Sequence, residues 1–181
     1  MPNSQDCNLD SILIKADRIY RHSLLRINYT TYDVWRSQDV VNALTSRCNI
    51  MVYNDDSGGD DTSANYPYRY ARVLGTYHTN VIYCGPGMLD HQSHRIEFLW
   101  VRWYHNTGTV LNGWDKLDRI SFGLMADDNT FGFLDPSAVL RGCHLIPVFA
   151  KGMLHSDGRG MSLCAQDSAD WKEYYVNRWV Q

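Results

Sequence analysis

The segment that decides the fold is Arg95-Ile96-Glu97-Phe98-Leu99-Trp100-Val101-Arg102-Trp103-Tyr104. Successive side chains of a β-strand point to opposite faces, and here both alternating sets contain large apolar groups. The two sets are Ile96, Phe98 and Trp100, and Leu99, Val101 and Trp103. A strand that is apolar on both faces is typical of the centre of a sheet or of a small barrel.

Strand-like segments continue on both sides of this central strand. Residues 50–53 and 66–83 precede it and are rich in Tyr, Val and Ile, which favour strands. We expect further short strands at 29–35, 118–124, 130–134 and within 139–149, with turns at Cys84-Gly85-Pro86-Gly87 and Asp135-Pro136-Ser137. The sequence therefore predicts a mainly β fold.

The two ends of the chain carry a helical pattern. Residues 9–27 repeat apolar groups at helical spacing, and residues 168–180 place Trp171 and Tyr174 on one helical side. We expect an N-terminal helix (1–28), a β-barrel-like recognition domain (29–150), and a mobile segment with a C-terminal helix packing on the same domain (151–181). The predicted fold is a small, partly open β-barrel with a helix near each terminus.

Composition narrows the class of protein. The 181 residues suit one domain, and 44% hydrophobic with 13% aromatic residues exclude a disordered chain. The formal net charge of −3 argues against a domain that holds DNA mainly through its phosphates. Five widely spaced cysteines without a CxxC pair favour reduced thiols and an intracellular location. No apolar run is long enough to span a membrane.

The residues that carry catalysis or bind metals do not form a recognisable motif. His91 and His94 make an HxxH pair, but zinc needs three or four convergent ligands. The acidic segment 55–63 lacks the ligand pattern of a calcium loop. Cys143 and His144 are neighbours on a predicted strand, so they point to opposite faces and cannot act as nucleophile and base. We therefore expect no enzyme, no catalytic residue, no metal and no cofactor.

Aromatic and arginine residues are the candidate binding groups. Tyr68 and Tyr70 share a strand face at period two, and Trp103 and Tyr104 end the central strand. Aromatic rings at a barrel mouth can hold a methylated ammonium through cation–π attraction, worth about 0.5–2 kcal/mol per contact. The candidates are Tyr68, Tyr70, Trp103 and Tyr104 for a ligand side chain, and Arg69, Arg72 and Arg102 for acidic groups. The alternatives are barrel core for the rings and surface or ion-pair charge for the arginines.

Several pieces of the chain between Ile27 and Ala150 resemble a known sequence type. The pieces include Tyr68-Arg69-Tyr70-Ala71-Arg72-Val73-Leu74-Gly75, Phe131-Gly132-Phe133-Leu134-Asp135-Pro136 and Val139-Leu140-Arg141-Gly142-Cys143-His144, with 26–34, 37–42, 96–103 and the tail residues Trp171 and 174–178. Together they resemble an uncharacterised domain of CACTA-type (Plavaka-like) transposon proteins in mushroom-forming fungi. This resemblance implies a transposon-derived protein. It does not imply catalysis, because no transposase acid triad is identifiable in the sequence.

A shorter set of matches resembles the bromo-adjacent homology domain. The pieces, in the order of that family, are Tyr70-Ala71-Arg72-Val73, Val101-Arg102-Trp103-Tyr104 and Arg141-Gly142-Cys143-His144. The resemblance implies a small β-barrel that binds histones, nucleosomes or other proteins.

The sequence as a whole thus predicts a non-catalytic, nuclear recognition module that binds a protein partner, such as a histone tail, or a nucleoprotein. One rival is a nucleic-acid-binding module, which requires a contiguous basic patch on the folded surface. Another is a metal-dependent hydrolase or nuclease, which requires a pocket where two carboxylates or His91 and His94 converge. A third is a transposon remnant that folds without a function. The sequence does not determine the oligomeric state.

Overall fold

A computed structural model of the chain describes residues 11–30, 36–54, 67–87, 90–108 and 117–177. Its strands are β1 (Ile12–His22), β2 (Leu25–Thr30), β3 (Arg36–Val41), β4 (Asn49–Tyr53), β5 (Tyr68–Tyr83), β6 (His94–Asn106), β7 (Arg119–Phe122), β8 (Phe131–Leu134), β9 (Val139–Gly142), β10 (His144–Pro147) and β11 (Tyr174–Asn177). Two short 3-10 turns, η2 (Pro136–Ala138) and η3 (Phe149–Lys151), lie between strands. The described residues contain no α-helix.

The mainly β prediction is confirmed. Strands β4 to β8 occupy the segments predicted at 50–53, 66–83, 95–104, 118–124 and 130–134. The predicted turn at Asp135 is η2, whose amide at Ser137 donates to the Asp135 carboxylate. The acidic segment 55–63, with the calcium loop considered for it, and residues 31–35 lie outside the described residues.

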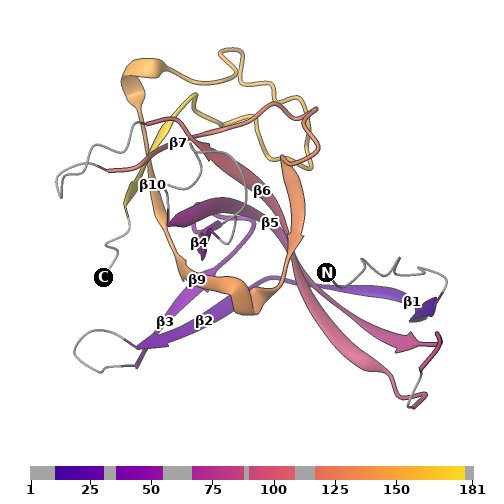
Figure 1. The fold of residues 1–181 in the computed structure, drawn as a ribbon. Helices are drawn as coiled ribbons and strands as arrows, with labels where there is room; N and C mark the ends of the chain where they lie inside the picture. Colours follow the sequence, from indigo (N-terminus) through magenta and orange to yellow (C-terminus); the bar gives the residue numbers. More distant parts are fainter. Residues whose placement is uncertain (1–10, 31–35, 55–66, 88–89, 109–116, 178–181) are drawn as a thin grey trace, which may run out of the picture.

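The main sheet closes almost completely into a barrel (Figure 1). Neighbouring strands follow the order β10-β11-β7-β6-β5-β4-β9, so β9 and β10 form the two ends of the path. Only Cys143 separates these two strands in the sequence. One bent stretch of chain, 139–147, therefore joins both edges of the sheet, and the predicted barrel is confirmed in this coarse sense.

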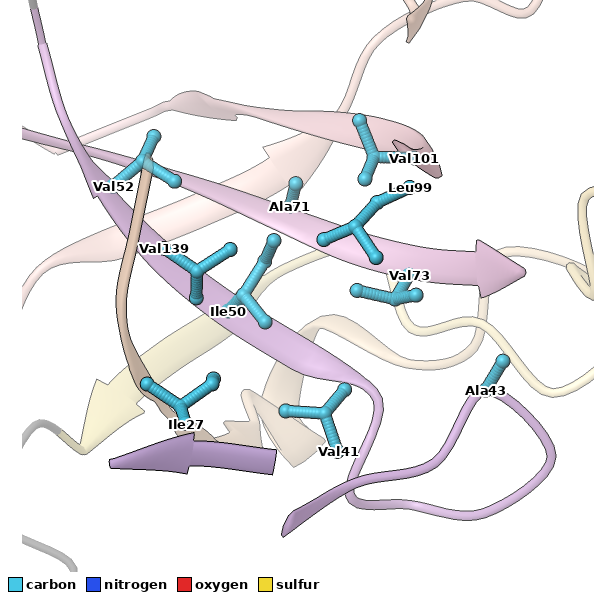
Figure 2. Packing of buried hydrophobic residues seen from close by; sticks show 10 residues of the cluster. All are labelled: Ile27, Val41, Ala43, Ile50, Val52, Ala71, Val73, Leu99, Val101 and Val139. Carbon is cyan, nitrogen blue, oxygen red and sulfur yellow. The ribbon is translucent and has the colours of Figure 1, made fainter. Parts of the chain in front are cut away.

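A first hydrophobic core fills one face of the central strands, as Figure 2 shows. Its members come from β4, β5, β6 and β9, from the hairpin β2–β3 and from the turn after β3: Ile27, Val41, Ala43, Ile50, Val52, Ala71, Val73, Leu99, Val101 and Val139. The hairpin is a separate two-stranded sheet. The Gly142 amide donates to Asp39 Oδ2 at 3.0 Å, which ties β9 to this hairpin.

A second hydrophobic core lies on the opposite face of the same central strands. It contains residues of β4, β5, β6, β7 and β11 and the linking residue Cys143: Met51, Tyr70, Tyr104, Ile120, Cys143, Tyr174 and Val176. Because both faces of β5 and β6 are covered here, this part of the barrel is buried on both sides. This double cover accounts for the apolar set that includes Leu99 and Val101, whereas Ile96, Phe98 and Trp100 of the other set belong to neither core.

A three-stranded arm leaves the barrel (Figure 1). It consists of β1, residues 77–83 of β5 and residues 94–98 of β6, paired antiparallel with β5 in the middle. We call these residues the arm. Almost every residue of β1 is exposed, so the arm contributes little to either core.

The predicted N-terminal helix is wrong, because residues 12–22 form β1 and residues 25–30 form β2. A large β-bulge explains the misleading pattern. Ile14 pairs with Val81 and Ile19 pairs with Thr79, so the four residues from Lys15 to Arg18 stand opposite Asn80 alone. The extra residues change the phase of the alternation in mid-strand, which gives the apolar groups a helix-like spacing.

The predicted C-terminal helix is also wrong over the residues that the structure describes. Tyr174–Asn177 forms β11, which pairs with β7 on one side and with β10 on the other. Two neighbouring strands offer backbone hydrogen bonds to this segment, and they override its helical spacing. Residues 178–181 lie outside the described residues.

Candidate recognition surface

The predicted binding residues lie on both faces of one pair of strands. In the antiparallel ladder of β5 and β6, Arg72 pairs with Arg102 and Ala71 pairs with Trp103. Paired residues share a face, and neighbours along a strand do not. The face toward the second core carries Tyr68, Tyr70, Arg72, Arg102 and Tyr104, and the opposite face carries Arg69 and Trp103. These seven residues therefore do not line one common mouth.

Arg72 and Arg102 form a buried ionic cluster with Asp170. Arg72 Nη1 lies 2.7 Å from Asp170 Oδ1, and Arg102 Nη1 lies 2.8 Å from Asp170 Oδ2. The side chains of Arg102 and Asp170 are each 1% exposed. Both guanidinium groups also lie over the Phe122 ring. The guanidinium carbon is 4.6 Å from the ring centroid for Arg72 and 3.7 Å for Arg102. One carboxylate thus holds two arginines inside the barrel, with Arg102 fully buried and the Arg72 side chain 12% exposed.

Electrostatics in this cluster follow from its burial. Burial raises the pKa of Asp170, although the two guanidiniums oppose this rise. Burial also raises the pKa of Tyr104 well above its ordinary value. Burial acts to lower the pKa of Arg72, but Tyr104 and Asp170 more than compensate, and this pKa is raised. Arg72 therefore stays charged, and its charge is used within the fold.

Tyr70 and Tyr104 are buried, and their hydroxyl groups form hydrogen bonds within the protein. The Tyr70 hydroxyl donates to Asp118 Oδ2 at 2.8 Å, and the Tyr104 hydroxyl donates to Asn49 Oδ1 at 3.0 Å. The Tyr104 ring stacks on Phe122 with 4.0 Å between centroids. This is the core arrangement that the sequence left open as the alternative for these rings.

Arg69 and Trp103 pair on the other face. The Arg69 guanidinium carbon lies 4.3 Å from the Trp103 ring centroid, within cation–π range. Trp103 is half-buried against the first core. A Cβ added at Gly132 of β8 would approach the indole nitrogen to 2.9 Å, so the glycine allows this close packing. Trp103, which the sequence suggested for a ligand's ammonium group, thus has a cation–π partner within the chain.

A groove lies at the base of the arm, among the described residues. It has a volume of about 530 Å³ and is lined by Arg95, Ile96, Glu97, Asp135, Pro136 and Ser137. Arg95 Nη2 lies 2.7 Å from Glu97 Oε1, and both side chains are about half exposed. Asp135 Oδ1 accepts from the Ser137 amide at 2.8 Å, and hydrogen bonding by Ser137 lowers the pKa of this carboxyl.

The groove forms because β8 pairs with only part of β6. Strand β8 pairs with Leu99 to Arg102 of β6, and its last residue, Leu134, pairs with Leu99. Asp135 and Pro136 then turn the chain into η2. Proline has no amide hydrogen and cannot continue the ladder. In the part of the chain that the structure describes, no strand pairs with residues 94–98 of β6 on this side.

Sequence reasoning did not select the groove residues. Arg95 and Glu97 begin the central strand, and Asp135-Pro136-Ser137 was recognised only as a turn. A usable signal was present: alternate charged residues open an otherwise apolar strand, which indicates that this end of the strand is solvent-exposed. What brings the two segments together is the pairing of β6 with β8, across more than thirty residues.

The residues considered for metal binding or catalysis stay apart. His91 and His94 are exposed, and His94 Nε2 lies 3.5 Å from Asp90 Oδ1. Within the described ranges, no three His, Cys, Asp or Glu side chains converge as a metal site would require. Cys143 is buried and His144 exposed; burial and the neighbouring Cys48 raise the pKa of the Cys143 thiol to about 12.

The described residues also contain no helix with the length and apolarity to cross a bilayer. Comparison of the chain with protein-family models, with curated proteins and with solved structures found no match.

Proposed function

We propose that this protein is a non-catalytic recognition module that binds an extended, basic segment of a protein partner in the groove beside β6. The observation that carries the proposal is the strand edge at residues 94–98, which lies next to a charged groove. An extended peptide can add to such an edge through main-chain hydrogen bonds, while its side chains enter neighbouring pockets.

The charges at the groove favour a basic ligand. Glu97 and Asp135 contribute two carboxylates against the single guanidinium of Arg95. The pKa of Asp135 lies below its ordinary value of 3.8, so this carboxylate stays ionised throughout the physiological range. Lysine-rich tails, such as those of histones, have the matching charge and adopt extended conformations.

The resemblances seen in the sequence place this proposal in a biological setting. A transposon-derived fungal protein with a fold like a bromo-adjacent homology domain would act in the nucleus, where histone tails are abundant. In this proposal the ligand binds at the β6 edge, and Tyr70, Tyr104, Arg72 and Arg102 support the barrel from within.

The test is a titration of the full chain with fluorescent peptides. One peptide is a lysine-rich histone tail, unmodified and with trimethylated lysine, and the other is an acidic peptide of equal length. We expect the basic peptide to bind and the acidic one not to bind. The double variant Glu97→Gln/Asp135→Asn keeps the hydrogen bonds of both side chains but removes both charges, and we expect it to weaken binding about 3- to 10-fold.

A matched control is Asp157→Asn. Asp157 is exposed, and its Oδ1 accepts from the amide of Arg159 at 3.0 Å, the same local bond that Asp135 makes to Ser137. Asp157 does not line the groove. The control should bind like the wild type; equal affinity of the wild type and the groove variant would rule out the proposed site.

Nucleic-acid binding is the second candidate, because the arm carries basic groups. Lys15, Arg18 and Arg21 of β1 are exposed, and only Asp17 opposes them on that strand. A β-ribbon of this kind fits the major groove of DNA. This function predicts binding of duplex DNA that falls steeply between 50 and 200 mM salt, and loss of binding in Lys15→Ala/Arg18→Ala/Arg21→Ala.

A further inference from the structure

We propose that the arm is a self-association surface, through which two copies of this chain pack face to face. The register of the arm separates its side chains into two faces. Paired residues share a face, which gives one set made of Ile12, Ile14, Ile19, Tyr77, Val81, Tyr83, Ile96 and Phe98, with the buried Thr79 in its middle. We call this set the apolar face; Arg21 and His94 lie at its two ends.

The opposite face of the arm is polar over most of its length. Tyr20, His22 and His78 stack there, and His22 Nε2 lies 2.6 Å from His78 Nδ1. Arg95 and Glu97 form their ion pair on the same face. Leu13 and Ile82 are the apolar pair at its outer end. The arm is therefore amphipathic, as expected of a sheet that packs on one side only.

The apolar face is exposed to an unusual degree. Ile12, Ile14, Ile19, Tyr83 and Ile96 are 39–56% exposed. Phe133 of β8, 74% exposed, extends the patch through an edge contact with Phe98 at 5.6 Å between centroids. A patch of about 400–600 Å² is at the upper limit of what monomeric proteins expose.

The area and the shape fit a second copy. Two such patches face to face would bury on the order of 1,000 Å² in total, which is the threshold for a specific but dissociable interface. A two-fold axis matches a mainly apolar surface with itself. Two sheets whose apolar faces meet about 10 Å apart form a sandwich, the usual way to bury such faces.

Among the described residues, β1 pairs only with β5, and its other edge is poorly suited to association. The bulge at Lys15 to Arg18 interrupts its ladder, with Ala16 and Asp17 at positive φ of 57° and 49°. The Thr79 hydroxyl donates to the Arg18 carbonyl at 2.9 Å and holds the bulge in place. Bulges and charged side chains are common protections against edge-to-edge pairing. Face packing is the mode of association that remains for β1.

Two adjacent residues of β1 allow a sharp test. Ile14 lies on the apolar face and Leu13 on the polar face, and Leu13 is the more exposed, at 54% against 39%. Analytical ultracentrifugation of the full chain over a wide concentration range should show a reversible monomer–dimer equilibrium. We expect Ile14→Lys to raise the dissociation constant at least about 100-fold, because two-fold symmetry places both new charges in the interface. Leu13→Lys should change it less than about threefold.

Far-UV circular dichroism and thermal melting check that both variants stay folded. Because both side chains are exposed, a lysine at either position should leave the barrel intact. The inference is overturned by a wild-type chain that stays monomeric at 200 µM, a concentration that saturates most interfaces of this size. It is equally overturned if Ile14→Lys leaves the dimer unchanged or if Leu13→Lys disrupts it as strongly. The groove variant Glu97→Gln/Asp135→Asn should still dimerise, which separates this inference from the proposed peptide binding.

Discussion

The inner and outer halves of β5 and β6 have similar composition but very different surroundings. Leu99 and Val101 in the inner half of β6 are fully buried, whereas Ile96 in the outer half is 47% exposed. In β5, Val73 is fully buried and Tyr83 is exposed. The ladder between the two strands runs through both halves. Hydrophobicity and strand pairing are therefore alike in the two halves. Burial differs because other strands cover only the inner half of the sheet.

The ionic cluster of the inner half should show the largest effect of any substitution. Asp170→Ala leaves Arg72 and Arg102 without their shared carboxylate. An uncompensated buried charge costs about 3–5 kcal/mol in the free energy of unfolding. Urea unfolding followed by fluorescence measures this loss, with Asp157→Ala as the exposed control. A loss below about 1 kcal/mol would show that the cluster is not buried as described.

Paired alanine substitutions along β6 compare the two halves directly. Leu99→Ala should reduce the free energy of unfolding by about 2–5 kcal/mol, because it creates a cavity in the first core. Ile96→Ala, three residues away in the arm, should cost less than about 1 kcal/mol, the range of strand propensity. Denaturant melts of both variants under identical conditions provide the comparison. Similar losses at the two positions would contradict the assignment of an uncovered arm.

Removing a tyrosine hydroxyl should reduce the free energy of unfolding by a smaller amount, and the loss should differ between a core and a surface tyrosine. Tyr70→Phe deletes the hydrogen bond to Asp118, and bonds to charged groups are worth about 1.5–3 kcal/mol when buried. We expect a loss of about 1–2 kcal/mol. The matched control is Tyr53→Phe, because Tyr53 is 61% exposed and its hydroxyl should contribute less than about 0.5 kcal/mol. Thermal unfolding resolves a difference of this size.

The smallest expected effect is a change in the pH dependence of stability. Although burial acts to raise it, the amides of Met161 and Ser162 together with His155 lower the pKa of Asp167 below 3.8. A carboxyl with a depressed folded pKa stabilises the fold above its unfolded pKa, and this stabilisation is lost as the pH falls through the folded pKa. Stability should therefore decrease below about pH 4.

The variant Asp167→Asn tests this pH dependence. It should have a flatter slope of unfolding free energy against pH between pH 5 and 3, whereas Asp157→Asn should keep the wild-type slope. Unchanged slopes in both variants would mean that the loop bonds to Asp167 do not form in solution.

Much of the strand pattern was predictable because local chemistry and burial agree there. Leu99 and Val101 of the segment 95–104 are apolar because the first core covers them, and Ile50, Met51 and Val52 form a short apolar run because they alternate between the two cores. The turn at Asp135-Pro136-Ser137 was predictable because Asp and Pro act locally, through a side-chain bond and a fixed backbone angle. In these places the residues themselves carry the information.

The candidate site was not predictable to the same degree. Tyr70, Arg72, Arg102 and Tyr104 were selected as exposed binding groups, yet their partners Asp118, Asp170 and Asn49 come from distant segments and satisfy them internally. A single sequence does not show which distant acid will meet which arginine. The groove at Glu97 and Asp135 was missed for the same reason, since it forms only when β8 leaves β6.

The sequence by itself determined a β-rich chain, the positions of its long central strands and the turn after β8, because alternation and turn chemistry act over a few residues. Only the tertiary structure decided the conformation of the two ends. There, β1 and β11 form instead of the predicted helices, because neighbouring strands pair with them. It also decided which aromatic and charged groups face inward. Backbone pairing and ion pairing between distant segments outweigh local helical spacing, and neither is encoded in any short stretch of residues.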